Sequence, residues 1–364
     1  FMRILHVAPI AGELGQGLSY SIPALAHAQS QTVHEVTLLT TGSSALPSNK
    51  WAFTLFWKGD LGKRSVPELK ELIGQHDIVV IHSTYIPYHA VIAASAHRLS
   101  IPYILVPRGG MTNGAAKIKP FKKAIGDALF FNRMVRRSRA LHCLTENEAT
   151  KSAYWGKQTF VAPNGIELAK LETSYQVNDP LRFLFIGRLS IFHKGLDLLL
   201  EAWAIFTRGG HNNSAILDIY GPDENGSRKK LEGLIEFYQV SDTVNVRDPV
   251  YGVEKLEVLK SSNVFVHTSR FEGHPMAVLE ALSVGLPCLL TPGTNIADSL
   301  EMEGAGIRVD ESSDEIAEGF SQIICQQEAL ISMSKKAREY AEVNTWDKVA
   351  EKTLAQYEMI LGTR

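Results

Sequence analysis

The sequence is poor in cysteine and has no long apolar segment. It contains three cysteines in 364 residues, Cys143, Cys288 and Cys325. An odd number of widely spaced cysteines in apolar surroundings predicts small core residues rather than a disulfide or metal framework, and it favours a reducing, cytoplasmic location. No apolar run reaches the roughly 18 residues that a membrane-spanning helix needs. The first residues lead directly into a strand pattern, so we expect neither a transmembrane helix nor a leader segment.

The chain also lacks an excess of charge of either sign. Lysine and arginine number 37 and aspartate and glutamate 39, which leaves a formal net charge of -2. Proteins that bind a polyanion as their main partner are usually basic, so we do not expect nucleic acid as a partner. The length suits two domains of ordinary size.

Short β-branched runs alternate with longer amphipathic segments throughout. The runs in the first part are RILHVAP, HEVTLLT, DIVVIHS, IPYILVP and ALHCLT, and later ones are RFLFIGRL, AILDIYG, TVNVRDP, NVFVHTS and PCLLTPG. The polar stretch from Leu168 to Leu181 separates the two groups and predicts a linker. This pattern predicts an α/β fold of two Rossmann-like, doubly wound domains, with ligands bound in a cleft at the carboxyl ends of the strands.

A glycine-rich turn, PIAGELGQGLS, follows the first expected strand. Gly15 and Gly17 either bring backbone N–H groups close to a phosphate or sugar or simply permit a tight turn, and the position at a strand end favours binding. The turn is not the dinucleotide fingerprint, because Tyr20 stands where a third glycine is required and the next strand ends without an acid. A nicotinamide-dependent dehydrogenase is therefore disfavoured.

Two basic residues lie in GRLSIFHKG, which follows the first strand of the second domain and precedes an apolar helix. Arg188 and Lys194 are expected to converge on one anion near the start of that helix, as binding of a diphosphate requires. The alternative is that both are solvated loop charges.

Two acids lie in SRFEGHPMAVLEALSVGLP: Glu272 before an apolar helix and Glu280 in its second turn. Pro275 suits the first helical position. Carboxylates accept hydrogen bonds but repel a diphosphate, so two of them near such a group are expected to face hydroxyl groups. A nucleotide sugar supplies these hydroxyls on its ribose and on its sugar ring.

The order of these parts resembles the retaining GT-B glycosyltransferases of family 4 over nearly the whole chain. The best matches are FIGRLSIFHKGLDLLLEA and the stretch with Glu272 and Glu280, which has the E-x7-E spacing of that family. Supporting matches are YGPDENGSRKKLEGLI, VAPNGIE and TPGTNIAD. The resemblance implies an acceptor domain at residues 1–170, a donor domain at residues 171–344, and a closing helix at about residues 345–364 that packs back on the first domain.

The resemblance also implies residue roles. Arg188 and Lys194 would bind the donor diphosphate, Glu280 the ribose, and Glu272 the donor sugar, with Arg188, Lys194 and Glu272 forming the catalytic group. The other donor contacts implied are Gly273, His274, Pro275, Met276, Arg247 (at the nucleoside base), Gly15 and Gly17. No D-x-D motif occurs, which fits metal-independent chemistry in which two cations replace a divalent ion. We therefore expect no metal site and no cofactor.

One segment departs from the family pattern. Family members often carry a histidine after the fourth strand, whereas this chain reads ILVPRGGMTNG, with Arg108 in that region. A similar Pro-Arg-Gly segment occurs in transferases that build exopolysaccharides, so Arg108 is a candidate contact for donor or acceptor. His82, at another strand end, either faces the cleft or is a packed core histidine.

The segment from Lys117 to Arg139 contains eight basic residues and a single acid, Asp127, interleaved with apolar side chains. It predicts either peripheral contact with an anionic membrane and a lipid-linked acceptor, or an ordinary solvated helix face.

Together these features predict a glycosyltransferase that moves a sugar from a nucleoside diphosphate sugar to an acceptor hydroxyl, with retention implied by the resemblance. A UDP-sugar is mildly preferred over a GDP-sugar, and the acceptor would be a glycan or lipid-linked sugar in polysaccharide or glycolipid assembly. The alternatives are a nucleotide-sugar epimerase or hydrolase on the same fold, and a nucleotide-sugar binding protein without turnover.

Overall fold

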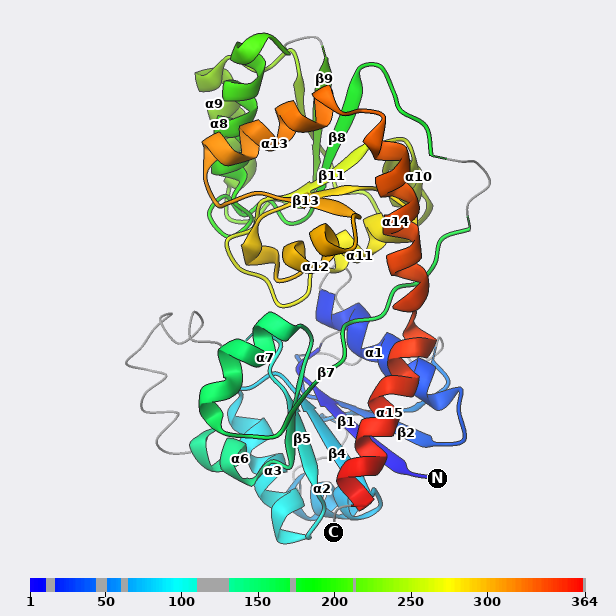
Figure 1. Cartoon of the computed structure of the whole chain (residues 1–364). Coiled ribbons are helices and arrows are strands. Elements are labelled where there is room, and N and C mark those ends of the chain that lie inside the picture. The colour runs from blue at the N-terminus through cyan, green and yellow to red at the C-terminus, as the bar shows by residue number, and fades with distance from the viewer. Residues whose placement is uncertain are drawn as a thin grey trace. The chain divides into compact units, whose positions relative to one another are not determined.

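A computed structural model of the chain describes residues 1–10, 17–43, 51–59, 65–109, 131–170, 175–211 and 214–362. The chain divides into two compact units (Figure 1). Unit 1 comprises Phe1–Gly165 together with Trp346–Arg364, and unit 2 comprises Ile166–Thr345.

Unit 1 contains a parallel seven-stranded sheet with the order β3-β2-β1-β4-β5-β6-β7. The sheet is doubly wound about the neighbouring strands β1 and β4. After β1 the chain continues to β2 and β3 at one edge of the sheet, and after β4 it continues to β5, β6 and β7 toward the other. The strands are β1 (Arg3–Ala8), β2 (Glu35–Thr40), β3 (Thr54–Trp57), β4 (Ile78–His82), β5 (Tyr103–Val106), β6 (Ala140–Cys143) and β7 (Thr159–Val161).

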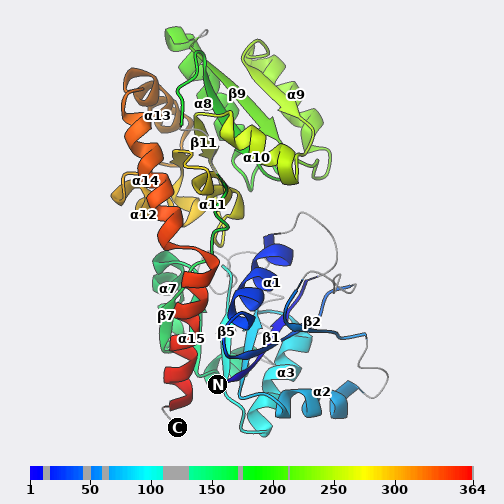
Figure 2. The same cartoon turned by 90° about the vertical axis from the view of Figure 1, so that its right-hand side faces the viewer.

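Helices cover both faces of this sheet, because successive side chains of a strand point to opposite faces and the strands are apolar on both. One face packs on α1 and α15, which lie side by side in Figures 1 and 2. The other face packs on α2, α3 and α6. The helical segments of unit 1 are α1 (Gly17–Ser30), α2 (Ser65–Gly74), α3 (Pro87–Arg98), α6 (Asn132–Arg137), α7 (Glu146–Ser152), the short η3 (Ala153–Trp155) and α15 (Trp346–Gly362).

The last helix belongs to the core of unit 1 although it follows unit 2 in sequence. Leu354, Tyr357 and Ile360 of α15 are buried against the strands and α1. Gln29 of α1 also donates a hydrogen bond to Thr353 of α15 at 2.8 Å. Unit 1 is therefore built from two separate pieces of the chain.

Unit 2 contains a parallel six-stranded sheet with the order β10-β9-β8-β11-β12-β13. Here the chain winds outward from the neighbouring strands β8 and β11. The strands are β8 (Leu181–Ile186), β9 (Ala215–Tyr220), β10 (Val244–Arg247), β11 (Val264–His267), β12 (Cys288–Leu290) and β13 (Gly306–Arg308).

Both faces of the second sheet are also covered. One face packs on α8, α9 and α13, with Trp203, Phe183 and Phe320 in edge-to-face contact at its centre. The other packs on α10, α11, α12 and α14. The helical segments are α8 (Leu196–Phe206), η4 (Thr207–His211), α9 (Ser227–Tyr238), α10 (Gly252–Lys260), α11 (Met276–Ser283), η5 (Pro292–Thr294), α12 (Ala297–Met302), α13 (Ser313–Cys325) and α14 (Ala329–Val343).

The prediction of an α/β chain with two doubly wound parallel sheets is confirmed. The interpretation of all three cysteines as core residues is wrong for Cys325, because it is the last residue of α13 and is exposed, whereas Cys143 and Cys288 are buried. All three are free thiols. Among the described residues, no helix is both long enough and apolar enough to cross a membrane.

Candidate active site

The candidate site in unit 2 lies where the winding of its sheet reverses. β8 and β11 are neighbours there, and the chain leaves them for opposite edges of the sheet. In doubly wound sheets the loops after such a pair diverge and leave room for a ligand at the carboxyl ends of the strands. Residues 187–195 follow β8 and residues 268–275 follow β11, and these are the loops that carry the predicted residues.

The two loops touch at Gly195 and Thr268. Gly195 has a φ of +61°, and a Cβ atom there would lie 2.0 Å from the carbonyl oxygen of Thr268, so only glycine fits. The Thr268 hydroxyl donates to the carbonyls of Lys194, at 3.2 Å, and of Gly195, at 3.0 Å. The position of Lys194 is thereby set by the strand on the other side of the switch point.

Arg270 holds the same two loops together. Its guanidinium donates to both carboxylate oxygens of Asp197, at 2.8 and 2.9 Å, and to the Phe192 carbonyl at 2.7 Å. It also stacks 4.4 Å above the Phe192 ring. A bidentate pair combined with stacking fixes the guanidinium in one orientation, so Arg270 is committed to loop structure.

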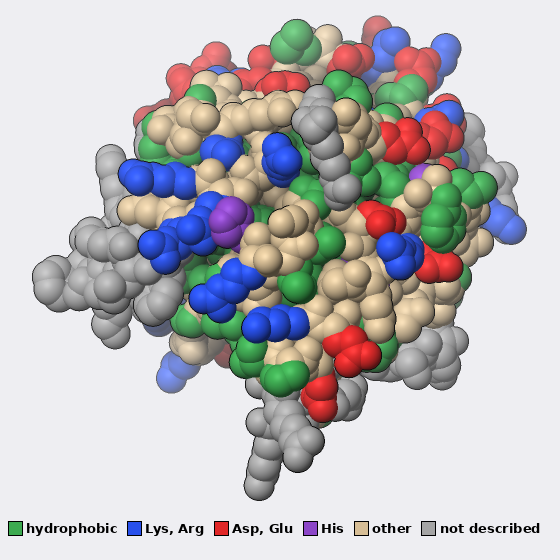
Figure 3. Space-filling model, turned by 90° about the horizontal axis from the view of Figure 1, so that it is seen from below, with side chains coloured by type: hydrophobic (Ala, Val, Ile, Leu, Met, Phe, Trp, Pro, Cys, Tyr) green, Lys and Arg blue, Asp and Glu red, His purple; other side chains and the backbone are tan. Residues whose placement is uncertain are grey.

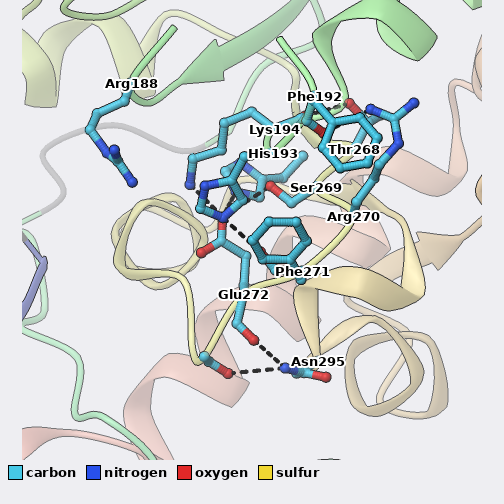
Figure 4. A network of polar contacts seen from close by, with 12 residues as sticks. Arg188, Phe192, His193, Lys194, Thr268, Ser269, Arg270, Phe271, Glu272 and Asn295 are labelled. Atoms are coloured by element: carbon cyan, nitrogen blue, oxygen red, sulfur yellow. Dashed lines mark hydrogen bonds and ion pairs between the residues drawn. The ribbon is translucent and has the colours of Figure 1, made fainter. Parts of the chain in front are cut away.

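Glu272 is the centre of a polar network (Figure 4). Its Oε1 forms an ion pair with Lys194, accepts a hydrogen bond from the Ser269 hydroxyl at 3.0 Å, and lies 3.3 Å from Nε2 of His267. His193 Nε2 lies 3.9 Å from the same oxygen. A carboxylate can only accept hydrogen bonds, so His267 donates from Nε2. The side chains of Glu272 and Lys194 are only 13% and 11% exposed.

Electrostatics keep Glu272 ionised. Burial raises the pKa of its carboxyl, but the hydrogen bond from His267 and the positive charge of Lys194 outweigh burial and lower that pKa well below its usual range. Burial lowers the pKa of His267, whose ring stacks on Phe185. At neutral pH the network therefore combines the Glu272 carboxylate with a neutral His267 imidazole.

Asn295 supports the loop that carries Glu272. Its side-chain amide donates to the backbone carbonyl of Glu272 and to that of Gly273 at 3.4 Å (Figure 4). Asn295 follows η5 in the left-handed conformation, with a φ of +61°. These contacts tie the backbone of Glu272 and Gly273 to the segment after η5.

Glu280 lies on α11, whose first residue is Met276. Pro275 is the residue before the helix rather than its first member, because its ψ of 111° is extended; this corrects the sequence-based expectation. The Glu280 side chain is 37% exposed and forms an ion pair with Lys255 of α10. His274 is buried, with 8% of its surface exposed. Glu280 is therefore more exposed than Glu272.

Arg188 and Lys194 do not share a partner. Arg188 pairs with Glu224, and its side chain is 48% exposed, whereas Lys194 pairs with Glu272. Figure 4 draws Arg188 beside the network with no interaction joining it to the other labelled residues. Their convergence on one anion stays a prediction.

Arg247 is engaged within the sheet. Its Nε donates to Asp218 Oδ1 at 3.1 Å, and its guanidinium lies 5.9 Å from the centre of the Tyr220 ring. Arg182 also pairs with Asp218, at 3.4 Å. The structure thus gives Arg247 a role at the edge of the sheet, and its contact with a nucleoside base stays a prediction.

The described candidate residues of unit 1 lie around its own switch point. Gly17 is the first residue of α1, while Gly15 lies outside the described residues. His82 is fully buried and its Nε2 lies 2.9 Å from Nδ1 of His6, which favours the core interpretation of this histidine. Arg108 donates to Nδ1 of His82 at 3.4 Å.

Sequence reasoning missed five residues of unit 2 that shape the site. They are His267, Ser269, Arg270, Asn295 and Lys255. His267 and Ser269 had a signal, because a histidine ending a buried strand and a polar residue after it mark a strand end at a switch point. The other three act through contacts that no local pattern encodes.

No group of three or more His, Cys, Asp or Glu side chains that would hold a metal ion occurs within the described ranges. The described site instead offers cations, carboxylates and a helix N-terminus. A helix N-terminus with unpaired N–H groups binds anions, and carboxylates bind hydroxyl groups. The arrangement thus suits a ligand that carries both phosphates and hydroxyls.

Two family models match the chain, one in each part. "Glycosyl transferase 4-like domain" matches residues 16–165, and "Glycosyl transferases group 1" matches residues 171–340. Together the two models cover most of the chain, which therefore belongs to the glycosyl transferase families that they describe. The second match contains the whole network around Glu272 and also Glu280, so the candidate site lies within the group 1 domain.

Curated relatives share about a quarter of their residues with this chain over the matched regions. An uncharacterized glycosyltransferase of Haemophilus influenzae is 27% identical over 216 residues, which are 57% of this chain and 58% of the relative. A D-inositol 3-phosphate glycosyltransferase of Paenarthrobacter aurescens is 25% identical over 207 residues, 54% of this chain and 50% of the relative. The matched regions thus span between half and three fifths of these curated relatives.

Solved structures share the fold over almost the whole length. WaaG, a glycosyltransferase involved in lipopolysaccharide biosynthesis, has a TM-score of 0.67 at 18% identity and covers 96% of this chain and 98% of its own. Anabaena Alr3699/HepE, solved in complex with UDP and glucose, has a TM-score of 0.73 at 14% identity, with 99% and 100% covered. At these identities the likeness shows the fold alone.

Proposed function

We propose that this GT-B glycosyltransferase moves a sugar from a nucleoside diphosphate sugar to an acceptor hydroxyl, with retention at the transferred carbon. The observation that carries the proposal is the network of Glu272, Lys194 and His267 at the switch point of unit 2, beside the N-terminus of α11. This network combines a cation and a helix end for phosphates with carboxylates for hydroxyls.

In the proposed complex, Arg188 and Lys194 bind the diphosphate. Arg188 is half exposed and needs only to leave Glu224, a surface pair of the kind that contributes little to stability. Lys194 is held in place by Glu272 and by the Thr268 contact to its carbonyl. Glu280 takes the ribose hydroxyls, and Glu272, with the backbone from Gly273 to Met276, takes the donor sugar.

The transfer step then needs no enzymic nucleophile. The bond between the sugar carbon and the diphosphate oxygen breaks, and its electron pair stays on the diphosphate. Lys194, Arg188 and the α11 N-terminus stabilise that negative charge. The acceptor oxygen attacks the same face of the sugar, and its proton passes to the departing phosphate oxygen. The two cations take the place of a divalent metal ion, so the reaction is proposed to be metal-independent.

The comparisons support finer proposals about the substrates. A UDP-sugar is preferred because a structure of the same fold holds UDP and glucose. Assembly of a polysaccharide or glycolipid is proposed because WaaG, also of the same fold, takes part in lipopolysaccharide biosynthesis. Unit 2 is the proposed donor domain and unit 1 the proposed acceptor domain.

Peripheral contact with an anionic membrane is also proposed, through the basic segment Lys117 to Arg139. Residues 117–130 lie outside the described residues, and the described part contributes Arg133, Arg136, Arg137 and Arg139, all exposed. Lys157 lies beside them, since its Nζ donates to the Arg136 carbonyl at 3.1 Å. Figure 3 shows lysine and arginine side chains gathered on one side of the face of unit 1 seen there. Such a patch attracts anionic lipid headgroups.

The test of the main proposal is incubation of the purified chain with radiolabelled UDP- and GDP-sugars, with and without glycan acceptors, in buffer containing a chelator. Transfer of label to acceptor is expected with a UDP-sugar. Conversion of donor in the absence of acceptor as the sole reaction would identify an epimerase or hydrolase instead. Binding of donor without any turnover would identify a nucleotide-sugar binding protein and refute the proposed enzymatic activity.

A further inference from the structure

Arg108 lies at the carboxyl end of the sheet of unit 1. It follows β5, which neighbours β4 in the sheet, and its guanidinium reaches back over the end of β4 to His82. This is the switch point of unit 1, where doubly wound sheets bind ligands. The backbone is left-handed at Arg108, with a φ of +52°, and at Gly109, with a φ of +82°. Such a conformation costs energy for a non-glycine residue and is typical of functional positions.

Every described acceptor of the Arg108 guanidinium is neutral. Nη1 donates to the Ser21 hydroxyl at 3.1 Å and to the Asn164 amide oxygen at 3.3 Å, and Nε donates to His82. Within the described residues, Nη2 has no hydrogen-bond partner. Arg108 is partly buried, and an arginine in such a position normally meets a carboxylate, because its charge otherwise stays uncompensated.

Glu148, the acid whose charge acts on Arg108, is already engaged with the backbone. Glu148 is 1% exposed, and its two carboxylate oxygens accept from the backbone N–H of Gly109 and, at 2.7 Å, from that of Leu144. Burial lowers the pKa of Arg108 to about 10 even though Glu148 opposes this shift. Glu148 thus acts on Arg108 only through its charge, and no described carboxylate accepts a hydrogen bond from the guanidinium.

A line of buried neutral groups fixes the guanidinium before any ligand arrives. His82 Nε2 lies 2.9 Å from His6 Nδ1, His6 Nε2 lies 2.7 Å from the Gln29 oxygen, and Gln29 donates to Thr353. One proton assignment satisfies the line: each histidine donates from Nε2 and accepts at Nδ1. His82 thus presents an acceptor to Arg108, and positioning of this kind raises affinity for a ligand.

We propose that Arg108 binds an oxyanion of the sugar acceptor, a phosphate or carboxylate group carried near the hydroxyl that receives the sugar. This inference rests on the proposed function, because it takes the ligand of Arg108 to be the sugar acceptor of that reaction. The donor diphosphate has its own proposed cations, Arg188 and Lys194, in unit 2. Arg108, in unit 1, is therefore assigned to the other substrate. The substrate class is accordingly an anionic glycan or a phosphate-bearing sugar rather than a neutral one.

Direct binding tests the site without any turnover. In the ¹⁵N-labelled full chain, the Nε–Hε signal of Arg108 is identified by its loss in R108K. Titration with inorganic phosphate is expected to shift this signal saturably, and the shift should persist when UDP saturates the donor site. Absence of a saturable shift would make Arg108 a structural residue, and abolition of the shift by UDP would assign the anion to the donor; either result overturns the proposal.

Kinetics with matched acceptors then tests specificity. The pairs are glucose 6-phosphate with glucose, and methyl glucuronide with methyl glucoside. R108Q is expected to raise KM for the anionic member by about 10- to 100-fold, the usual effect of losing hydrogen bonds to a charged group, while KM for the neutral member stays unchanged. R98Q is the matched control, because Arg98 is exposed at the far end of α3, and it should change neither value.

The variants separate structure from recognition. R108G removes the energetic cost of the left-handed backbone, and R108K keeps the positive charge without the planar guanidinium. Both variants therefore still test the proposal if R108Q does not fold. An equal loss with both members of each pair in R108K and R108G would contradict recognition of an anion. A chain that transfers no sugar at all would refute the proposed function, while the phosphate titration would still decide whether Arg108 binds an oxyanion.

Discussion

Lys255 and Glu280 form an ion pair between α10 and α11, and Glu280 remains 37% exposed within it. Glu272, eight positions earlier, is held by Lys194, Ser269 and His267 and is only 13% exposed. The two acids of one sequence motif therefore stand in different electrostatic settings, and different functional effects follow.

Glu280→Ala is expected to weaken binding of free UDP by about 10- to 100-fold, because the ribose loses hydrogen bonds to a charged group. Glu272→Ala is expected to lower kcat with a smaller effect on UDP affinity, since Glu272 is proposed to face the transferred sugar. Isothermal titration with UDP and initial-rate kinetics measure the two effects. Equal losses of UDP affinity in both variants would refute this division of roles.

Asn295→Ala is expected to lower kcat, because the backbone of Glu272 and Gly273 loses its side-chain anchor. Loss of a neutral hydrogen bond costs about 1 kcal/mol of the free energy of unfolding. Asn178→Ala is the matched control, since Asn178 also donates to a backbone carbonyl, that of Ser261, but at an exposed position. If both variants kept full kcat, the anchor would not support catalysis.

Gly195→Ala and Gly226→Ala provide a matched pair for loop packing. Both glycines are left-handed, at φ +61° and +74°, but a Cβ at Gly195 meets the Thr268 carbonyl at 2.0 Å, whereas a Cβ at Gly226 meets nothing within 4 Å. Gly226→Ala should cost about 1–2 kcal/mol for the backbone conformation alone. Gly195→Ala should cost about 1–3 kcal/mol more through overpacking. Urea unfolding measures both, and equal costs would mean that the loop moves aside.

The buried histidines of unit 1 predict acid sensitivity. Burial lowers the pKa of His6 and of His89 to about 4 and of His142 to about 3, from an ordinary value near 6.5. Between these values the unfolded chain binds more protons than the folded one, so stability is complete above about pH 6.5 and falls as the pH drops toward 4. Glu272, whose folded pKa is depressed, adds a loss that begins only near pH 4.5.

Hydrogen exchange tests the contribution of the histidines. Amides of β1 and β4, which carry His6 and His82, should lose protection between pH 6.5 and 4.5, after correction for the intrinsic exchange rate. Equal protection of β1 across that range would show that the histidines are not held neutral by the fold.

Replacement of Arg133, Arg136, Arg137 and Arg139 by glutamine is expected to reduce sedimentation with anionic vesicles at low salt. Each basic residue near such a surface contributes about 1 kcal/mol, and added salt weakens the attraction. UDP binding should be unaffected and serves as the control. If the unaltered chain does not sediment with anionic vesicles at low salt, the segment is an ordinary solvated face.

Much of the fold was predictable because apolar alternation and chain rhythm encode it locally. Each predicted strand run contains a strand, such as DIVVIHS with β4 and NVFVHTS with β11. β3 and β7 were missed because they lie at the edges of the first sheet and are only partly buried, so their apolar pattern is weak. β13 was missed for the same reason at the edge of the second.

The site was predictable only where a motif carries it. Glu272 and Glu280 stood out by spacing, but Asn295 reaches Glu272 across 23 positions of sequence and Lys194 reaches it across 78. Such contacts depend on which loops the sheet brings together. For that reason the sequence did not predict that Arg188 pairs with Glu224 or that Arg247 pairs with Asp218.

The split composition of unit 1 has a consequence for its synthesis on the ribosome. About 180 residues of unit 2 are translated between Gly165 and the helix that completes the first core. At 5 to 20 residues per second this interval lasts roughly 10 to 40 s. During it, the apolar surface that Leu354, Tyr357 and Ile360 later cover stays open, and unit 2, a continuous piece of chain, has all its strands by the end of the interval. The nascent N-terminal part of the chain thus exposes a surface that chaperones can bind throughout this interval.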